Sequence, residues 1–304
     1  MSGDRRSTEW PTLALLAATY AVWALATTVA AALWLPLGVA LTALAVAMHS
    51  SLQHEALHGH PFRDARLNAA LVFPALGLFI PYGRFRDQHL AHHRDATLTD
   101  PYDDPESNYL DPAVWARLPR PVRGLLRANN TLLGRMLLGP AISQAAFLAG
   151  EGARLRAGDR AVAAAWGWHA AALVPVALWL GSVAALPLWA YLLSAYLGMS
   201  LLKIRTFLEH QAHPHAPART AIIEDRGPLA LLFLNNNLHV VHHMHPRLPW
   251  YRLPATYAAR RADYLRRNGG YAYRSYAQVF RRHLLRAKDP VPHPLRPAAP
   301  DRPA

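Results

Sequence analysis

The sequence predicts an all-α integral membrane protein with four transmembrane helices in two hairpins, interfacial helices and a His-rich cap on the cytoplasmic side. Three observations predict this fold class. Hydrophobic residues make up 52% of the 304 residues and charged residues only 17%, which is apolar for a soluble protein of this size. The apolar residues fall into long blocks. Seventeen histidines are present, and most of them cluster at the ends of these blocks.

The first apolar block, from about residue 11 to residue 50, is too long for one crossing of a hydrocarbon core about 30 Å thick. Leu35-Pro36-Leu37-Gly38 interrupts it, so we expect two helices, over residues 12–32 and 37–57. The N-terminal segment also fits a signal peptide cleaved near residue 30. Because a second apolar span follows at once, we favour an uncleaved membrane helix.

Residues 69–82 are apolar but short and contain two prolines, which favours a re-entrant or interfacial segment over a full span. A second pair of spans is expected over residues 161–181 and 184–206, separated by Gly181-Ser182. Between the two hairpins, residues 100–152 are mixed and Arg-containing, a composition typical of amphipathic helices at a membrane surface.

The basic residues predict the orientation of the chain. The formal net charge is +13, and residues 245–304 hold 13 basic against 3 acidic residues. Next to apolar spans, such a segment favours anionic lipid rather than nucleic acid as its partner. The positive-inside rule then places the histidine clusters and both termini in the cytoplasm, with the spans in a bacterial inner membrane. We divide the chain into a membrane domain, residues 1–265, and an Arg/Pro-rich cytoplasmic tail, residues 266–304.

Three histidine boxes have the spacing of one helix face. HEALH is an HxxxH box, whereas HLAHH and HVVHH are HxxHH boxes. Their members are His54 and His58, then His89, His92 and His93, then His239, His242 and His243. Residues i, i+3 and i+4 of a helix share a side, so we expect the imidazoles of each box to point the same way. Isolated histidines such as His169 and His293 are expected to be ordinary polar groups.

The number of imidazoles indicates more than one metal ion. Neutral imidazole is a ligand for iron, zinc, copper and nickel. The three boxes supply eight imidazoles, and one more from the looser group His210, His213 and His215 makes nine. A tetrahedral zinc site uses at most four ligands, so at least two metal ions are expected. The chain has no cysteine, which excludes thiolate-bound metal and iron–sulfur clusters.

These motifs resemble those of the membrane fatty-acid desaturase superfamily, which includes related hydroxylases and carotenoid ketolases. The resemblance covers residues 37–260 and rests on HEALH, HLAHH and HVVHH, with further matches in HHRDATLTDPYDDP, RTFLEH and HHMHPRLPWYRLP. It implies two non-haem iron ions that activate O2 with two external electrons, no catalytic residue beyond that centre, and His210 as an additional ligand.

The resemblance also implies a reaction and its partners. We expect desaturation of an aliphatic chain, with a fatty acyl chain as the first choice. The alternative is hydroxylation or ketone formation on a carotenoid or a small amino-acid-like metabolite. No cytochrome b5-like HPGG segment is present, so the electrons are expected from a separate ferredoxin, cytochrome or flavoprotein reductase.

The sequence departs from the family pattern at several positions. His60 and His245 are extra imidazoles beside boxes one and three, and Thr206 stands where some relatives have an Asn that holds a water on one iron. The run Asn235–Asn237 could supply that amide, although Asn residues before a helix are also ordinary caps. Polar residues expected to orient the ligands are Glu55, Asp95, Asp100, Asp103, Asp104, Arg205, Glu209 and Asn235.

Two other classes of protein compete with this interpretation. HEALH matches the HExxH pattern of zinc proteases, with Glu55 as general base. The extended HExxHxxGxxH pattern is absent, however, because Pro61 and Asp64 occupy its Gly and third His positions. A metal transporter would place its ligands inside the spans, whereas these histidines lie at the ends of the spans. We therefore favour the oxidoreductase.

Overall fold

The computed structural model describes residues 8–93 and 95–296, and the description below concerns these residues. The first half contains α1 Trp10–Leu25, the π-helix η1 Ala26–Ala30, α2 Ala31–Leu33, α3 Leu35–Leu57, α4 Ala65–Leu71, α5 Tyr82–His92, the 3-10 helix η2 Asp95–Thr97, α6 Pro112–Arg117, α7 Arg120–Asn129, α8 Leu132–Leu137 and α9 Gly139–Arg156. The second half contains α10 Arg160–Ser182, α11 Leu188–Thr206, the 3-10 helix η3 Ala216–Arg219, β1 Ile222–Ile223, α12 Pro228–Leu232, α13 His239–Met244, the 3-10 helix η4 Trp250–Arg252, α14 Leu253–Ala259, α15 Arg261–Arg267, β2 Ala272–Tyr273 and α16 Tyr276–His283.

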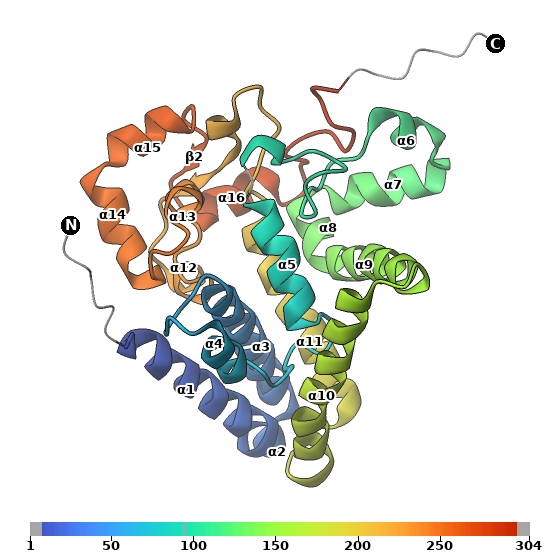
Figure 1. Ribbon diagram of the computed structural model, residues 1–304, viewed down its shortest axis with the longest axis vertical. Helices are drawn as coiled ribbons and strands as arrows, with labels where there is room; N and C mark the ends of the chain where they lie inside the picture. Colours follow the sequence, from blue (N-terminus) through green and yellow to red (C-terminus); the bar gives the residue numbers. More distant parts are fainter. Residues whose placement is uncertain (1–7, 94, 297–304) are drawn as a thin grey trace.

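The molecule is mostly helical, with long apolar helices at one end and short elements at the other. In Figure 1, α1, α2 and α3 lie side by side at the lower left, and α10 and α11 lie at the lower right. The shorter elements from α5 to α8 and from α12 to α16 lie toward the opposite end. One exception to an all-α fold is a small parallel sheet, in which Ile222 pairs with Ala272 and Ile223 with Tyr273.

Three helical stretches of the described chain are long and apolar enough to cross a membrane. They are Trp10–Leu33, Leu35–Leu57 and Arg160–Ser182. The first two form the predicted hairpin, and the break between them is the single extended residue Trp34, two residues before Pro36. The turn is tight: a Cβ on Gly38 would lie 2.6 Å from the Cα of Ala31.

The fourth predicted span forms α11, which differs from the other three. Its last turn carries Lys203 and Arg205, and much of its surface is buried, including Tyr191 and Gly198. α11 packs along α3, so many of its side chains face protein and need not be apolar. The α11 helix is therefore present as expected, but its crossing of a membrane stays a prediction.

The apolar segment 72–81 is irregular rather than a span, and side chains from other helices satisfy its backbone. The carbonyl of Leu76 accepts from the hydroxyl of Tyr191 (2.9 Å), and that of Leu78 lies 2.8 Å from Nε2 of His169. Gln144 donates to the carbonyl of Phe79 (2.9 Å). Non-helical backbone inside a membrane protein requires such partners, and His169 is thus a structural hydrogen-bonding group.

The segment predicted to be a C-terminal tail is folded against the rest of the chain as far as Arg296. Tyr276 and Val279 of α16 are buried in a core with Phe233. Further on, the N–H of Leu110 donates to the carbonyl of Val291, and the N–H of His293 donates back to Leu110. The C-terminal residues therefore hold the loop that follows α5, while the domain boundary at residue 265 stays a prediction.

Gly198 lets α11 approach α3 closely, and we expect its replacement to destabilise the protein. A Cβ there would lie 2.8 Å from Cγ1 of Val46 and 3.1 Å from the carbonyl oxygen of Ala43. Overpacking of this kind costs about 1–3 kcal/mol. Gly167→Ala in α10 is the matched control, since a Cβ there has no atom within 4 Å. Gly198→Ala should lower the thermal unfolding midpoint in detergent, whereas Gly167→Ala should not. Equal midpoints would contradict this packing.

Candidate metal centre

Nine histidines form two adjoining groups of imidazoles. In each group the possible ligand atoms lie within 4.8 Å of one another. The five-His group consists of His54, His58, His89, His93 and His242. The four-His group consists of His92, His210, His239 and His243. The rings of His93 and His243 stack with centroids 4.4 Å apart, so the two groups lie directly side by side.

Each HxxHH box divides its imidazoles between the two groups. In HLAHH, residues i and i+4 join the five-His group and i+3 joins the four-His group, whereas in HVVHH the assignment is reversed. Each helical residue turns by about 100°, so i and i+4 differ by about 40° and i+3 lies about 60° to the other side. The expected common side of the helix is present, but the expectation did not include this division of each box between two groups. The three imidazoles share one side of the helix but straddle two sites.

Helix ends bring these residues together. His54 lies in the last turn of α3 and His58 caps that helix. His89 and His92 lie in the last turn of α5. The whole of α13 carries box three, and it follows a tight turn in which Leu234 and Asn235 have positive φ values of 51° and 57°. Asparagine tolerates this left-handed conformation better than most residues.

Nitrogen atoms converge within both groups. In the four-His group, Nε2 of His210 lies 2.8 Å from Nε2 of His92 and 3.0 Å from Nε2 of His239. In the five-His group, Nε2 of His89 lies 3.2 Å from Nε2 of His58 and 3.0 Å from Nε2 of His93. Two imidazoles bound at right angles to one metal ion, with bonds of about 2.1 Å, place their nitrogens about 3 Å apart. The spacing therefore fits a shared cation in each group.

Carboxylates fix the orientation of two of the imidazoles. Nδ1 of His92 lies 2.7 Å from Oδ1 of Asp104, and Nδ1 of His89 lies 2.9 Å from Oε1 of Glu106. An ionised carboxylate only accepts hydrogen bonds, so each Nδ1–H must donate. Nε2 of a neutral ring is then left with the lone pair that a metal requires.

A third imidazole is oriented by a chain of polar groups. Nδ1 of His239 lies 3.0 Å from Oδ1 of Asn236, whose amide nitrogen donates to Glu209 (3.4 Å). The Glu209 carboxylate pairs in turn with Arg205 at 2.9 Å. Because all four residues are buried, this chain fixes the His239 ring without contact with water.

The chemistry of the donors also fits a metal. Nε2 of His54 is buried among the other imidazoles of the five-His group and has no hydrogen-bond partner within the described part of the chain. Burying such a nitrogen is unfavourable unless a ligand binds there. An all-imidazole donor set suits iron, zinc, copper or nickel. Both groups can therefore hold a metal ion.

Burial and neighbouring charges act on the pKa values of these rings in opposite ways. Burial lowers the pKa of His210, His239 and His242 well below the usual value, which favours their neutral, metal-binding form. Burial also acts to lower the pKa of His92, but the carboxylates of Glu106 and Asp104 outweigh it and raise this pKa to about 9. A cation bound at Nε2 of His92 takes the place of that proton.

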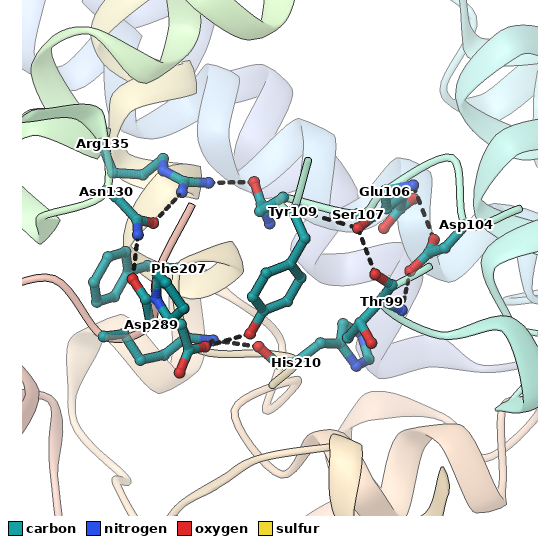
Figure 2. A pocket seen from close by; sticks show the side chains of 13 residues that line it. Thr99, Asp104, Glu106, Ser107, Tyr109, Asn130, Arg135, Phe207, His210 and Asp289 are labelled. Atoms are coloured by element: carbon teal, nitrogen blue, oxygen red, sulfur yellow. Dashed lines mark hydrogen bonds and ion pairs between the residues drawn. The ribbon is translucent and has the colours of Figure 1, made fainter. Parts of the chain in front are cut away.

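A small polar cavity of about 20 Å³ adjoins the four-His group, large enough for one water molecule. Figure 2 shows Asp104 and Glu106 at one end, Asn130 and Asp289 at the other, and Tyr109 between them. Oδ2 of Asp104 accepts from the backbone N–H of Thr99 (2.8 Å), and Tyr109 donates to Asp289. The cavity wall therefore holds in place the loop that supplies the two carboxylates.

Other predicted polar residues have different partners. Asp100 caps a turn and pairs with Arg296 (2.6 Å), so it holds the C-terminal segment rather than an imidazole. Glu55 accepts from the backbone N–H of Trp250 (3.1 Å), and the amide of Asn235 donates to the carbonyl of the same Trp250 (3.1 Å). The side chain of Asp95 lies outside the described part of the structure.

Sequence reasoning missed Glu106, which lies two residues beyond the recognised Asp104. Its only signal is that it continues the acidic run YDDPE. Two of the extra histidines lie outside both groups: Nδ1 of His60 contacts Glu9 at 2.8 Å, and His245 is exposed at the end of α13. His213 and His215 lie beside each other in the loop after His210.

Comparison with known proteins decides the family. A sequence model described as Fatty acid desaturase matches residues 30–276. This chain belongs to the fatty acid desaturase family. The match includes all nine histidines of the two groups and ends within α16. Membership of this family, together with the apolar helices, makes the chain a membrane oxidoreductase.

Two curated proteins are similar to this family member over most of their length. A beta-carotene ketolase of Paracoccus sp. (strain N81106 / MBIC 01143) is 26% identical over 219 residues, which cover 67% of this chain and 72% of the ketolase. A beta-carotene ketolase of Paracoccus sp. (strain PC1) is 27% identical over 219 residues, with the same coverage.

For this desaturase-family chain, we expect Asp104→Asn to weaken metal binding by about 10–100-fold, as is typical when a carboxylate behind a ligating His is lost. Metal per polypeptide, measured by elemental mass spectrometry after dialysis against a graded chelator, provides the test. Asp100→Asn is the matched control, because its carboxylate lies on the same loop but contacts Arg296. Equal retention in the two variants would show that Asp104 does not support a ligand.

Proposed function

We propose that the protein is a non-haem diiron oxidoreductase that uses O2 and two electrons per turnover to oxidise C–H bonds of a long apolar substrate. The observation that carries this proposal is the pair of imidazole groups at the ends of apolar helices. Nine neutral donors hold two cations without cancelling their charge. When bound, two iron ions would supply the activation of O2 and the removal of hydrogen from carbon.

The residues of the chain have defined tasks in this reaction. Imidazoles of both groups hold the metal, and Asp104, Glu106 and Asn236 keep three of these rings in the required tautomer. α3 carries His54 at its end and presents an apolar body to the lipid, so a hydrocarbon chain can reach the metal centre from within the membrane.

The overall balance requires an external reductant. Desaturation removes two hydrogens from neighbouring carbons and reduces one O2 to two waters, which takes two further electrons and two protons. Ketone formation at one CH2 group takes two turnovers, each with one O2, two electrons and two protons. In each turnover one oxygen atom is inserted into a C–H bond and the other leaves as water, and the resulting diol on one carbon then loses a water to give the ketone. The chain has no cysteine to hold an iron–sulfur cluster, so we propose a separate ferredoxin, cytochrome or flavoprotein reductase as electron donor.

Two outcomes of the reaction have specific support. The family match favours desaturation of a fatty acyl chain. The similarity to two beta-carotene ketolases favours hydroxylation and ketone formation on a carotenoid. We propose oxygenation of a carotenoid as the first candidate, because both of these curated relatives are beta-carotene ketolases, and acyl desaturation as the second.

The arrangement of HEALH disfavours a zinc protease. His54 and His58 share their group with three imidazoles from other boxes, whereas a catalytic zinc uses three protein ligands and keeps an open position. Glu55 accepts a hydrogen bond from the backbone of Trp250, which occupies the group that a protease needs as its base.

We further propose that the spans lie in a bacterial inner membrane with the metal centre in the cytoplasm. Support comes from the charge distribution, since 13 of the 32 basic residues lie in residues 245–304, and cytoplasmic segments carry an excess of Arg and Lys.

Product analysis tests the proposed reaction. The protein is expressed with a bacterial ferredoxin and its reductase in cells that make both acyl lipids and beta-carotene, and extracts are compared with and without air. A carotenoid that gains one oxygen and loses two hydrogens supports ketone formation, and an acyl chain that loses only two hydrogens supports desaturation. No O2-dependent product in either fraction would overturn the proposal.

In the same assay, His92→Ala and His242→Ala are expected to abolish product and to lower bound iron, because each removes one imidazole from a different group. His215→Ala is the control, since this exposed side chain belongs to neither group. Full activity in either of the first two variants would refute the assignment of ligands.

A further inference from the structure

The short helix α7, Arg120–Asn129, has two chemically different edges. Arg120, Arg123 and Arg127 lie within an arc of about 60°. On the other side, Val122 and Leu125 remain 38% and 45% exposed. An exposed apolar edge parallel to a row of cations is the pattern of a helix that lies in a membrane surface.

The positive charge around α7 has no acidic counterpart among the described residues. Residues 112–130 contain four arginines and no acidic residue. Among the residues that the structure describes, none of these arginines forms an ion pair, and Arg127 instead lies over the ring of Trp115 at 5.4 Å. An anionic partner would therefore meet four unpaired guanidinium groups.

Helix α8, which packs against α7 and against α11, also exposes apolar side chains. Leu133 and Leu137 of α8 are 37% and 59% exposed, and the carbonyl of Leu137 accepts from the hydroxyl of Tyr196 on α11. α8 also packs against α9, which contacts the apolar helix α10. In Figure 1, α7, α8 and α9 follow one another down one side of the molecule toward α10.

The base of α7 is tied to the loop behind the metal centre. Arg135 of α8 donates to the carbonyl of Asn129 (3.0 Å) and to the side chain of Asn108. Asn108 belongs to the loop that carries Asp104 and Glu106. Helix α7 is therefore connected, through Arg135 and Asn108, to the loop that orients His89 and His92.

We propose that α7 is an interfacial anchor that lies in the headgroup layer of an anionic membrane leaflet. Val122 and Leu125 insert toward the acyl chains, and Arg120, Arg123 and Arg127 contact lipid phosphates. An acidic protein partner would pair with the arginines but would not account for the exposed apolar side chains of Val122 and Leu125. A lipid surface accommodates both edges at once.

Site-directed spin labelling tests this proposal directly, because the chain contains no cysteine and every single-Cys variant carries one label. Leu125→Cys reports on the apolar edge. Gly124→Cys is the matched control on the arginine edge, where an added Cβ has no atom within 4 Å. Gly167→Cys, at an exposed and equally open position in α10, is the reference for immersion in the bilayer.

The full-length protein is labelled and reconstituted in vesicles of phosphatidylcholine with or without phosphatidylglycerol. Collision rates with O2, which concentrates in the bilayer, and with a water-soluble nickel chelate give the depth of each label. In phosphatidylglycerol vesicles the label at residue 125 should lose its collisions with nickel, as the label at residue 167 does, whereas the label at residue 124 should keep them. High salt should reverse part of the change at residue 125.

A charge variant separates lipid binding from simple burial. Combining Arg120→Gln, Arg123→Gln and Arg127→Gln in the Leu125→Cys background should restore nickel collisions and remove the dependence on phosphatidylglycerol. Arg260→Gln, Arg267→Gln and Arg281→Gln remove the same charge from exposed sites on other elements and should have no effect on this label.

Two results would overturn the proposal. One is a label at residue 125 that collides with nickel as often as the label at residue 124 in every kind of vesicle. This result counts against the proposal even if an added acidic electron donor then protects the label at residue 125. The other is a label already protected in detergent, which would indicate contact with protein. These readouts do not depend on turnover, so they are independent of the proposed reaction.

Discussion

The structure depends on one geometric constraint, the convergence of imidazole nitrogens from the ends of α3 and α5, from α13 and from the segment after α11. Seven of the nine rings are buried and His93 and His210 are partly buried, which is unfavourable unless each ring finds a partner. Here every ring belongs to one of two groups in which the nitrogens face one another. The crossed use of the two HxxHH boxes follows from helix geometry, since one helical turn cannot aim three side chains at a single point. Two adjoining sites are the natural result, and they share the wall formed by His93 and His243.

Convergence alone does not prepare a metal site, because each ring must also present its lone pair. The segment after α5 orients two of the rings: Asp104 accepts a hydrogen bond from Nδ1 of His92, and Glu106 accepts one from Nδ1 of His89. That segment is itself irregular and is held from outside, by backbone bonds to the C-terminal residues and by Arg296. The end of the chain, which contributes no imidazole to either group, therefore stabilises the orientation of the ligands.

The apolar half of the molecule also helps to position the imidazoles, because it fixes the helices that end at the metal centre. Close contact of α11 with α3 requires the absence of a side chain at Gly198, and α11 leads to His210, whose ring contacts His92, His239 and His243. The irregular segment 72–81 leads into α5 and is fixed by hydrogen bonds from Tyr191, His169 and Gln144. A shift in these contacts would move the origin of α5 and with it three of the nine imidazoles.

The sequence by itself determined the helical class, the first hairpin and the eight histidines of the three boxes, because periodicity and composition are local properties. The choice of His210 as the ninth was implied only by the family resemblance. Spacing within HLAHH and HVVHH identified the residues but not their division between two groups, since that depends on how α5 and α13 face each other. Glu106 could not be distinguished from a solvated acid until the loop placed it against His89. Asp100 and Asn235 resembled ligand partners in sequence, yet their bonds go to Arg296 and Trp250. Hydrogen-bond partners far apart in the chain are chosen by packing, and packing is decided only by the tertiary structure.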